Sequence, residues 1–91
     1  MPVPATDILR SADILRRHGA TRIVLFGTAL DAPEAARDLD LAVDGIEGWG
    51  FFRAAAEVER EVSVPVDLVP LSPPSRFTRH IERRGRLLYE R

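Results

Sequence analysis

The sequence contains no cysteine and no lysine, and none of its apolar runs approaches the length of a membrane-spanning helix. The absence of cysteine excludes disulfides, thiol catalysis and cysteine-based zinc sites. Since there is neither a spanning run nor an apolar signal segment at the start, we expect a soluble, cytoplasmic protein without membrane association. All 13 cationic side chains are arginines. Guanidinium groups suit phosphate and carboxylate partners, but a GC-rich genome produces the same bias.

The net charge is −1 over 91 residues, so the chain has no bulk electrostatic footprint for nucleic acid, and direct nucleic-acid binding is not expected. The length predicts a single domain over residues 1–91, in which residues 1–5, with two prolines, form a loose lead-in. A domain of this size buries only about 60–65% of its unfolded surface. Association into a homo-oligomer or hetero-oligomer would therefore help it.

Hydrophobic periodicity predicts helices alternating with strands. The helices are expected from a cap at Thr6 or Asp7 to about His18, from Gly48–Gly50 to about Val62, and from Ser72–Pro73 to about Arg84. The strands are expected over residues 22–26, 39–43 and 65–69, with a helical turn in the connector 28–37. Leu87–Tyr89 form an apolar patch that must pack on the body or on another chain. This order predicts an α/β (α+β) fold, a small mixed β-sheet covered by helices.

The helices predicted before Val62 and after Pro73 each show an apolar face at helical spacing. The inward residues of the first are expected to be Phe51, Ala55, Val58 and Val62. The last helix is expected to turn Phe77 and Ile81 inward. Its many arginines either contact phosphate or an acidic partner, or form a solvated face. His18 is interpreted as a helix-end residue and not as a ligand.

Two aspartates, Asp38 and Asp40, stand at the start of the predicted second strand. Alternate strand residues share a face, so these carboxylates point one way, about 7 Å apart, while the apolar residues between and after them point the other. A half-exposed strand with a wet face would explain this pattern equally well. An EF-hand is excluded, because counting from Asp38 the sixth position is not glycine and the twelfth is not glutamate.

A third aspartate, Asp67, lies in the predicted third strand, 27 residues after Asp40. Three carboxylates on strands facing one cleft form an oxygen-rich site suited to Mg²⁺. Gly27 and Thr28 end the first strand. Glycine lets the backbone approach a ligand closely, and amides at a helix N-terminus bind phosphate. Each motif alone is common, but the succession of a strand, Gly-Thr, nine residues, Asp-x-Asp and a later strand-borne Asp is much rarer.

This succession resembles the minimal nucleotidyltransferase (MNT) domain of the DNA polymerase beta-like superfamily. The pattern of that family is a strand, Gly-Ser, a connector, Asp-x-Asp, and a third Asp on a later strand. In this sequence LFGT corresponds to the Gly-Ser segment, RDLDLAV to the two-aspartate strand and VDLVPL to the third-aspartate strand. The tail IERRGRLLYER is similar to the closing segment of such domains, and the resemblance covers the chain from Asp7 to Tyr89.

The resemblance implies a nucleotidyltransferase that uses ATP as substrate and two Mg²⁺ ions. It gives catalytic and metal-binding roles to the three aspartates, Asp38, Asp40 and Asp67. Asp67 would complete one metal shell and accept the proton of the attacking hydroxyl. Gly27 and Thr28 would cradle the triphosphate.

Two departures from the family pattern weaken the expected phosphate site. Thr28 replaces the usual serine, and the following connector lacks basic residues and carries Asp31. Arginines elsewhere would have to compensate, and the candidates for nucleotide binding are Arg37, Arg76 and Arg79. The last helix follows the Asp67 strand closely, so Arg76 and Arg79, in its first turn, are predicted to lie nearer the triphosphate than Arg83 and Arg84.

Stand-alone domains of this family are typically antitoxins of a HEPN-type ribonuclease toxin, and some add AMP to a tyrosine of that toxin. The resemblance therefore implies a HEPN-type toxin as partner. Two functions stay open, an enzyme that adenylylates its partner and a catalytically silent module that blocks a toxin by contact alone. The three aspartates favour the first, and the acidic connector favours the second. Either a partner surface or ordinary core would be formed by the remaining apolar residues, Trp49, Phe51, Phe52 and the Leu87–Tyr89 patch.

Overall fold

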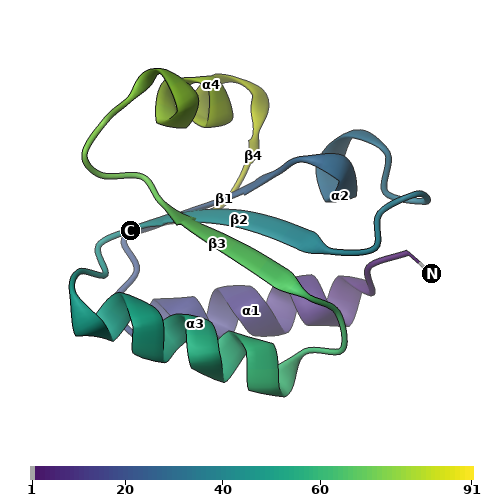
Figure 1. Ribbon diagram of the computed structural model, residues 1–91, viewed down its shortest axis with the longest axis horizontal. Coiled ribbons are helices and arrows are strands. Elements are labelled where there is room, and N and C mark those ends of the chain that lie inside the picture. Colours follow the sequence, from purple (N-terminus) through teal and green to yellow (C-terminus); the bar gives the residue numbers. More distant parts are fainter. Residues whose placement is uncertain (1) are drawn as a thin grey trace.

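The computed structural model describes residues 2–91 and has three layers, with a four-stranded sheet between helices (Figure 1). The elements in chain order are α1 (Ala5–Arg17), β1 (Arg22–Phe26), α2 (Thr28–Asp31), β2 (Leu39–Asp44), α3 (Trp49–Glu61), β3 (Val66–Pro70), α4 (Arg76–Arg84) and β4 (Arg86–Glu90). Residues 2–4 of the predicted lead-in precede α1, and Met1 lies outside the described residues. Between residues 2 and 91, no helix has the length and apolar character that crossing a membrane requires.

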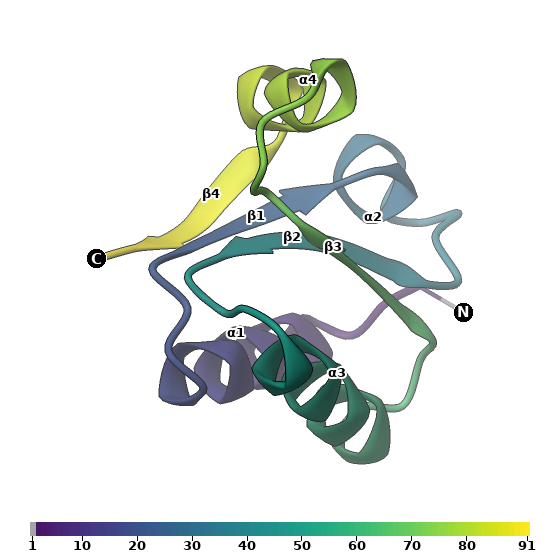
Figure 2. The same ribbon diagram turned by 60° about the vertical axis from the view of Figure 1, so that its left-hand side comes forward.

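The sheet is mixed, as predicted, with the strand order β3-β2-β1-β4 (Figure 2). β1 pairs antiparallel with both β2 and β4, whereas β2 and β3 run parallel. Parallel neighbours need a crossover, and α3 supplies it. Pro65 before β3 and Pro70 at its end fit the edge position of this strand. Proline has no backbone N–H to donate, and an edge strand needs ladder hydrogen bonds on one side only. The three buried residues of the central strand β1, Ile23–Leu25, confirm the prediction of a strand buried on both faces.

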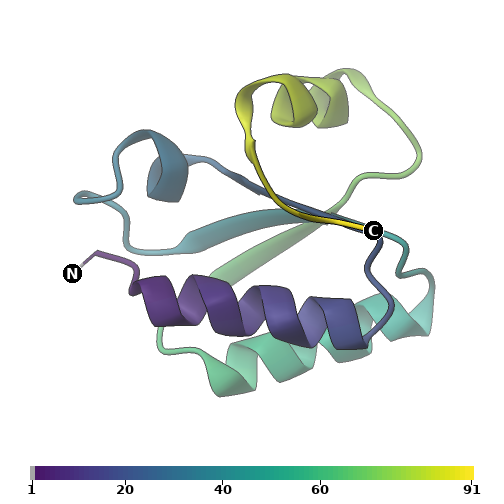
Figure 3. The same cartoon turned by 180° about the vertical axis from the view of Figure 1, so that it is seen from behind.

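Helices α1 and α3 lie side by side under one face of the sheet (Figures 1 and 3). Leu39, Leu41 and Val43 alternate along β2 and are at most 1% exposed on this face. From the helices, Leu15 and Val58, both fully buried, join the same cluster. The period-2 pattern read from the sequence thus points into the main core, as expected.

The face that α3 turns inward differs in part from the predicted one. Ala54 and Val58 are fully buried, whereas Phe51, Ala55 and Val62 are only partly buried. A small side chain at position 54 lets α3 approach the sheet closely. Phe51 and Val62 pack against the core from the border of this face.

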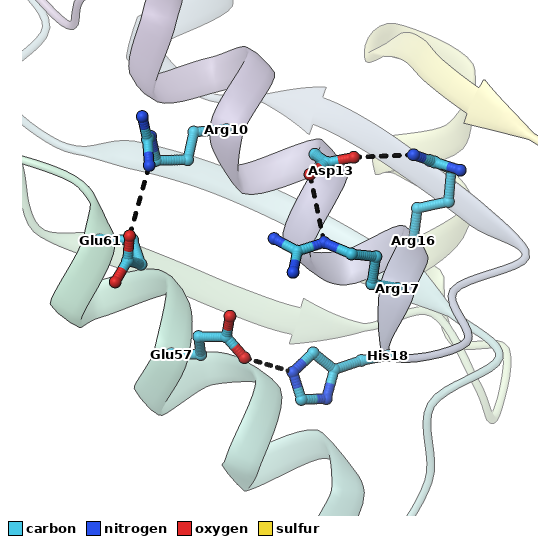
Figure 4. A network of polar contacts seen from close by, with 7 residues as sticks. All are labelled: Arg10, Asp13, Arg16, Arg17, His18, Glu57 and Glu61. Atoms are coloured by element: carbon cyan, nitrogen blue, oxygen red, sulfur yellow. Dashed lines mark hydrogen bonds and ion pairs between the residues drawn. The ribbon is translucent and has the colours of Figure 1, made fainter.

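Polar side chains connect the solvent side of α1 with α3 (Figure 4). Arg10 pairs with Glu61 at 3.3 Å, and His18 Nε2 lies 2.8 Å from Glu57 Oε1. His18 is therefore a helix-end residue, as predicted, and the hydrogen bond from its ring lowers the pKa of Glu57. These contacts lie at the surface, where such pairs contribute little stability.

Asp7 does not cap α1, contrary to the prediction. The residue before the helix is Pro4, and no side chain caps this end. The buried Asp7 carboxylate instead accepts hydrogen bonds from Ser63 Oγ at 2.6 Å and from Ser63 N at 3.1 Å. It thereby fixes the start of α1 against the chain that leaves α3.

The opposite face of the sheet is partly covered by α4, which buries Ile81 against Val24, Ala42 and Leu71. This helix begins at Arg76, later than the start predicted from the Ser-Pro pair at 72–73, because the side chain of Ser75 forms a capping box with Thr78. Thr78 and Ile81 are the buried residues of α4. Phe77, predicted to point inward, is 53% exposed.

The last strand, β4, was not predicted. Leu88 and Tyr89 pack against the core of the same chain as part of this antiparallel edge strand beside β1, whereas Leu87 is 47% exposed. Gly85 makes the turn from α4 possible, because a Cβ there would lie 2.6 Å from Ile81 O and 2.9 Å from Leu25 O, and would also meet the Val24 side chain. A five-residue strand that follows a helix after one residue leaves almost no turn signal in the sequence.

Replacing Gly85 by Ala should therefore destabilise the protein. Two of the atoms that the new methyl would meet belong to the backbone and cannot swing away. Overpacking of this kind costs about 1–3 kcal/mol, which lowers the melting temperature of a domain of this size by several degrees. Thermal unfolding followed by circular dichroism measures the effect.

Gly50→Ala is the matched control. Its Cβ would meet only Ile46 Cγ2, at 3.6 Å, and the position lies inside α3. Alanine is the better helix former, so this variant should melt at the wild-type temperature or above it. Equal melting of both variants and the wild type would refute the tight α4–β4 turn.

Candidate functional site: an aspartate cluster beside Gly27

Two of the three predicted site aspartates lie directly next to each other across β2 and β3. The parallel register pairs Asp40 with Asp67, and neighbouring strands are about 4.8 Å apart. Both alternate with apolar core residues and so point to the face opposite α1 and α3. Asp38 stands one residue before β2 and is exposed.

The three carboxylates are close enough to interact electrostatically. Partial burial raises the pKa of Asp40, and the negative charges of Asp38 and of Asp67 raise it further. Like charges brought together in a partly desolvated place disfavour the ionised form. A cation bound there would relieve this repulsion.

Gly27 lies against the Asp40 side chain. Phe26, the last residue of β1, is the register partner of Asp40, and Gly27 follows it with φ +75°. A Cβ at this position would lie 3.1 Å from Asp40 Cγ and would collide with the carboxylate oxygen Oδ2. Both the positive φ and the close approach require glycine here. Thr28 is exposed and opens the single turn of α2.

A pocket of about 200 Å³ lies beside Gly27, between α2 and α4. From α4 it is lined by Phe77, His80, Ile81 and Arg84. Arg76 and Arg79, predicted to bind nucleotide, are exposed and are not among its lining residues. Arg37 is also exposed, next to Asp38. Roles in nucleotide binding for these three arginines stay predictions.

His80 and Arg84 are thus the polar residues near Gly27 that the sequence analysis did not select. The sequence does indicate that they lie together, because Phe77, His80 and Arg84 stand at positions i, i+3 and i+7 and so share one helix face. Arg76 and Arg79 were predicted to bind nucleotide because, of the arginines of this helix, they stand nearest to Asp67 in the sequence. The burial of Thr78 and Ile81 decides the actual rotation of the helix.

The aspartates suit a magnesium ion in chemistry and number. Mg²⁺ prefers carboxylate oxygens, takes one or two of them and completes its shell with water and phosphate. Over residues 2–91, no three acidic, histidine or cysteine side chains stand together as a ready-made metal cluster. Asp40 and Asp67 are adjacent, Asp38 is nearby, and no arginine in the described part forms an ion pair with them. This arrangement fits an ion that arrives with a nucleotide.

A larger pocket, of about 430 Å³, lies at the other end of β2, beside Val43, Ile46 and Phe51. At its rim Phe52 is 63% exposed, and the neighbouring Trp49 is 78% exposed with its ring 5.8 Å from that of Phe52. Phe51 is partly buried and joins the core, while Leu88 packs against the core from β4. An apolar surface of this kind, away from the aspartates, is typical of contact sites.

No protein-family model matches the sequence, and no curated protein matches it significantly. Among solved structures, a chain of a mutant toxin–antitoxin MntA–HpeT crystal structure superposes with a TM-score of 0.75 at 21% identity, over 92% of this chain and 72% of that chain. A chain of the tri-AMPylated Shewanella oneidensis HEPN toxin in complex with MNT antitoxin superposes with a TM-score of 0.71 at 21% identity. The match covers 94% of this chain and 71% of that chain. The resemblance to the minimal nucleotidyltransferase domain is therefore confirmed at the level of the fold, which is that of the MntA antitoxin.

Proposed function

We propose that this protein is a Mg²⁺-dependent nucleotidyltransferase that transfers AMP from ATP to a protein partner, and that it acts as the antitoxin of a HEPN-type toxin. The observation that carries the proposal is the pairing of Asp40 with Asp67 beside Gly27. The fold supports it, since one similar structure is described as an AMPylated HEPN toxin in complex with an MNT antitoxin.

In this proposal Asp38, Asp40 and Asp67 would hold the magnesium, which when bound neutralises the phosphates and stabilises the leaving pyrophosphate. A hydroxyl oxygen of the partner attacks the α-phosphorus of ATP. The bond from that phosphorus to the bridging oxygen of the pyrophosphate breaks, and pyrophosphate leaves. Asp67, the more exposed member of the pair, accepts the hydroxyl proton. The products are the adenylylated partner and pyrophosphate.

Gly27 contributes to this chemistry because it has no side chain. Without a Cβ the end of β1 meets Asp40 directly, so the backbone of residues 27–28 and the aspartates border the same space. Phosphates held at Gly27 and Thr28 would therefore lie next to the carboxylates that bind their counter-ion.

A second candidate function is neutralisation of the toxin by contact alone. The exposed aromatic pair of Trp49 and Phe52 supports it, because large exposed aromatics are enriched in protein interfaces. Asp31 on α2 supports it as well, because it adds negative charge close to where phosphates would bind. Both functions share the same partner and differ in whether a covalent product forms.

Replacing Asp67 by Asn should reduce transfer by several orders of magnitude, because it removes a ligand and the proton acceptor while keeping the shape. The assay incubates the protein with a HEPN-type protein and with ATP labelled in the α-phosphate, and counts label on the HEPN-type protein. Asp13→Asn, on the opposite side of the molecule, should transfer as wild type does. A wild-type protein that labels nothing yet suppresses toxicity would establish contact inhibition instead.

Asp40→Asn should raise the melting temperature at neutral pH in EDTA. The raised pKa of Asp40 means that its ionised form is less favourable in the folded than in the unfolded protein. Its destabilising contribution is therefore absent below the ordinary pKa, grows as the pH rises from the ordinary to the folded-state pKa, and is fully present above the latter. The stability gain of the variant should shrink as the pH falls towards about 4.

With magnesium and ATP bound, the wild type should melt at a higher temperature than Asp40→Asn. Saturating Mg²⁺ and ATP raise the melting temperature of the wild type by mass action. Asp40→Asn lacks one metal-binding carboxylate, so its melting temperature should not respond. Differential scanning fluorimetry at pH 7 with EDTA, with Mg²⁺ and with Mg²⁺ plus ATP measures both effects. An equal response of wild type and variant would exclude Asp40 as a metal ligand.

Contact with the partner should depend on the aromatic pair under both functions. Trp49→Ala and Phe52→Ala remove exposed side chains and should leave the fold intact. Each is expected to weaken binding of the HEPN-type protein by about 1 kcal/mol or more, as truncation of an interface anchor does. Surface plasmon resonance measures this, with Leu9→Ala, another large exposed apolar residue at 70% exposure, as control. Unchanged affinity in both aromatic variants would remove this surface from the interface.

A further inference from the structure

The pocket between α2 and α4 adjoins the aspartate cluster through a single residue. Gly27 lines this pocket and also lies against the carboxylate of Asp40. A ligand that touches the aspartates can therefore extend past Gly27 into the pocket without leaving the surface of the protein. Any nucleotide bound at the cluster has this pocket as its immediate neighbour.

The walls of the pocket are largely apolar and aromatic. Phe26 lines it and contacts Phe77 edge-to-face, with ring centroids 6.1 Å apart and an interplanar angle of 84°. Leu30 of α2 and Ile81 of α4 complete the apolar lining. Since Phe77 is 53% exposed although Ile81 on the same helix is buried, part of its ring is available to a ligand. Aromatic rings of this kind stack on nucleobases.

Size restricts what the pocket can hold. Its volume is about 200 Å³, whereas sites that enclose a whole drug-sized ligand measure about 300–1,000 Å³. The pocket therefore suits one part of a nucleotide, either the base or a group of phosphates.

The acidic side chain in the pocket wall favours the base over the phosphates. His80 and Arg84 lie on the α4 wall, and Asp31 lies on the α2 wall. None of the three forms an ion pair within residues 2–91. The Asp31 carboxylate would repel phosphates, but it accepts a hydrogen bond from an exocyclic amine. The Arg84 guanidinium donates to ring nitrogens or carbonyl oxygens.

We propose that this pocket binds the nucleobase of the nucleoside triphosphate, with Phe77 stacking on the ring and with Arg84 and Asp31 contacting its polar edge. The preferred base then carries an exocyclic amine, as adenine does. The inference rests on the proposed function, because it places the phosphates at Gly27 beside the aspartates. It identifies Phe77, Arg84 and Asp31 as residues for nucleotide specificity.

The test compares two probes, ATP and inorganic tripolyphosphate, each with Mg²⁺ and measured by isothermal titration calorimetry. Phe77→Ala should weaken ATP binding about fivefold or more, which is the lower end of what a stacked base contributes. Tripolyphosphate has no base, so its affinity should not change. Leu9→Ala, which removes a large exposed apolar side chain from α1, is the control and should bind both probes as wild type does.

A second pair of variants separates the base from the phosphates. Arg84→Gln should weaken ATP but not tripolyphosphate, whereas Arg83→Gln, which does not line the pocket, should change neither. Equal losses of both probes in Arg84→Gln would assign the pocket to phosphates and overturn the inference. Melting curves of all variants without ligand verify that each is folded.

The outcomes distinguish this inference from the proposed function. If wild type binds both probes and Phe77→Ala leaves ATP affinity unchanged, the base pocket is refuted while the nucleotide site stands. If wild type binds neither probe, both fail together. A preference of wild type for ATP over UTP that disappears in Asp31→Ala would support the role of the acidic wall, and a preference that persists would contradict it.

Discussion

Two like charges held side by side on parallel strands are the constraint around which this small domain is arranged. Asp40 and Asp67 are register partners, and partial burial together with the neighbouring carboxylates raises the pKa of Asp40. Such a pair costs folding free energy, so other interactions must keep it in place. The largest is the burial of apolar side chains on the opposite face of the same strands, since each fully buried leucine contributes about 1.5–3 kcal/mol.

The direction of the aspartates depends on that apolar layer. Leu39 and Leu41 are completely buried against α1 and α3, and a slip of the register by one residue would move them into water and the aspartates into the core. The α3 crossover sets β3 parallel to β2, and Asp7 binds Ser63 just before β3 begins. Helix packing on one face thereby determines where charge gathers on the other.

The second face is only partly covered, and this has consequences for binding. α4 buries Ile81 on Val24 and Ala42, and Gly85 returns the chain to β1 without a loop. The helix therefore stands beside Gly27 and leaves a pocket there, while the aromatic pair of Trp49 and Phe52 lies near the opposite end of β2. The pocket beside Gly27 and the exposed aromatic pair are therefore separate regions of the surface.

Features that depend on near neighbours along the chain could be predicted from the amino-acid sequence. The apolar runs of β1 and β2, the alternation that turns Asp38 and Asp40 away from the core, and the glycine at the end of β1 all follow from periods of two or from single residues. The mixed sheet covered by helices could be predicted for the same reason. The predicted cap at Asp7 failed because a distant residue, Ser63, competes for the carboxylate.

Which residues from distant segments meet depends on how the helices and strands pack together. Asp67 lies beside Asp40 because the α3 crossover sets their register, and no local pattern contains that information. The edge strand β4 exists because Gly85 fits against β1. Arg84 lines the pocket beside Gly27, and Arg76 and Arg79 do not, because burial of Thr78 and Ile81 sets the rotation of α4. Periodicity shows which residues of a helix share a face, but the partner of that face is chosen by packing between segments far apart in the chain.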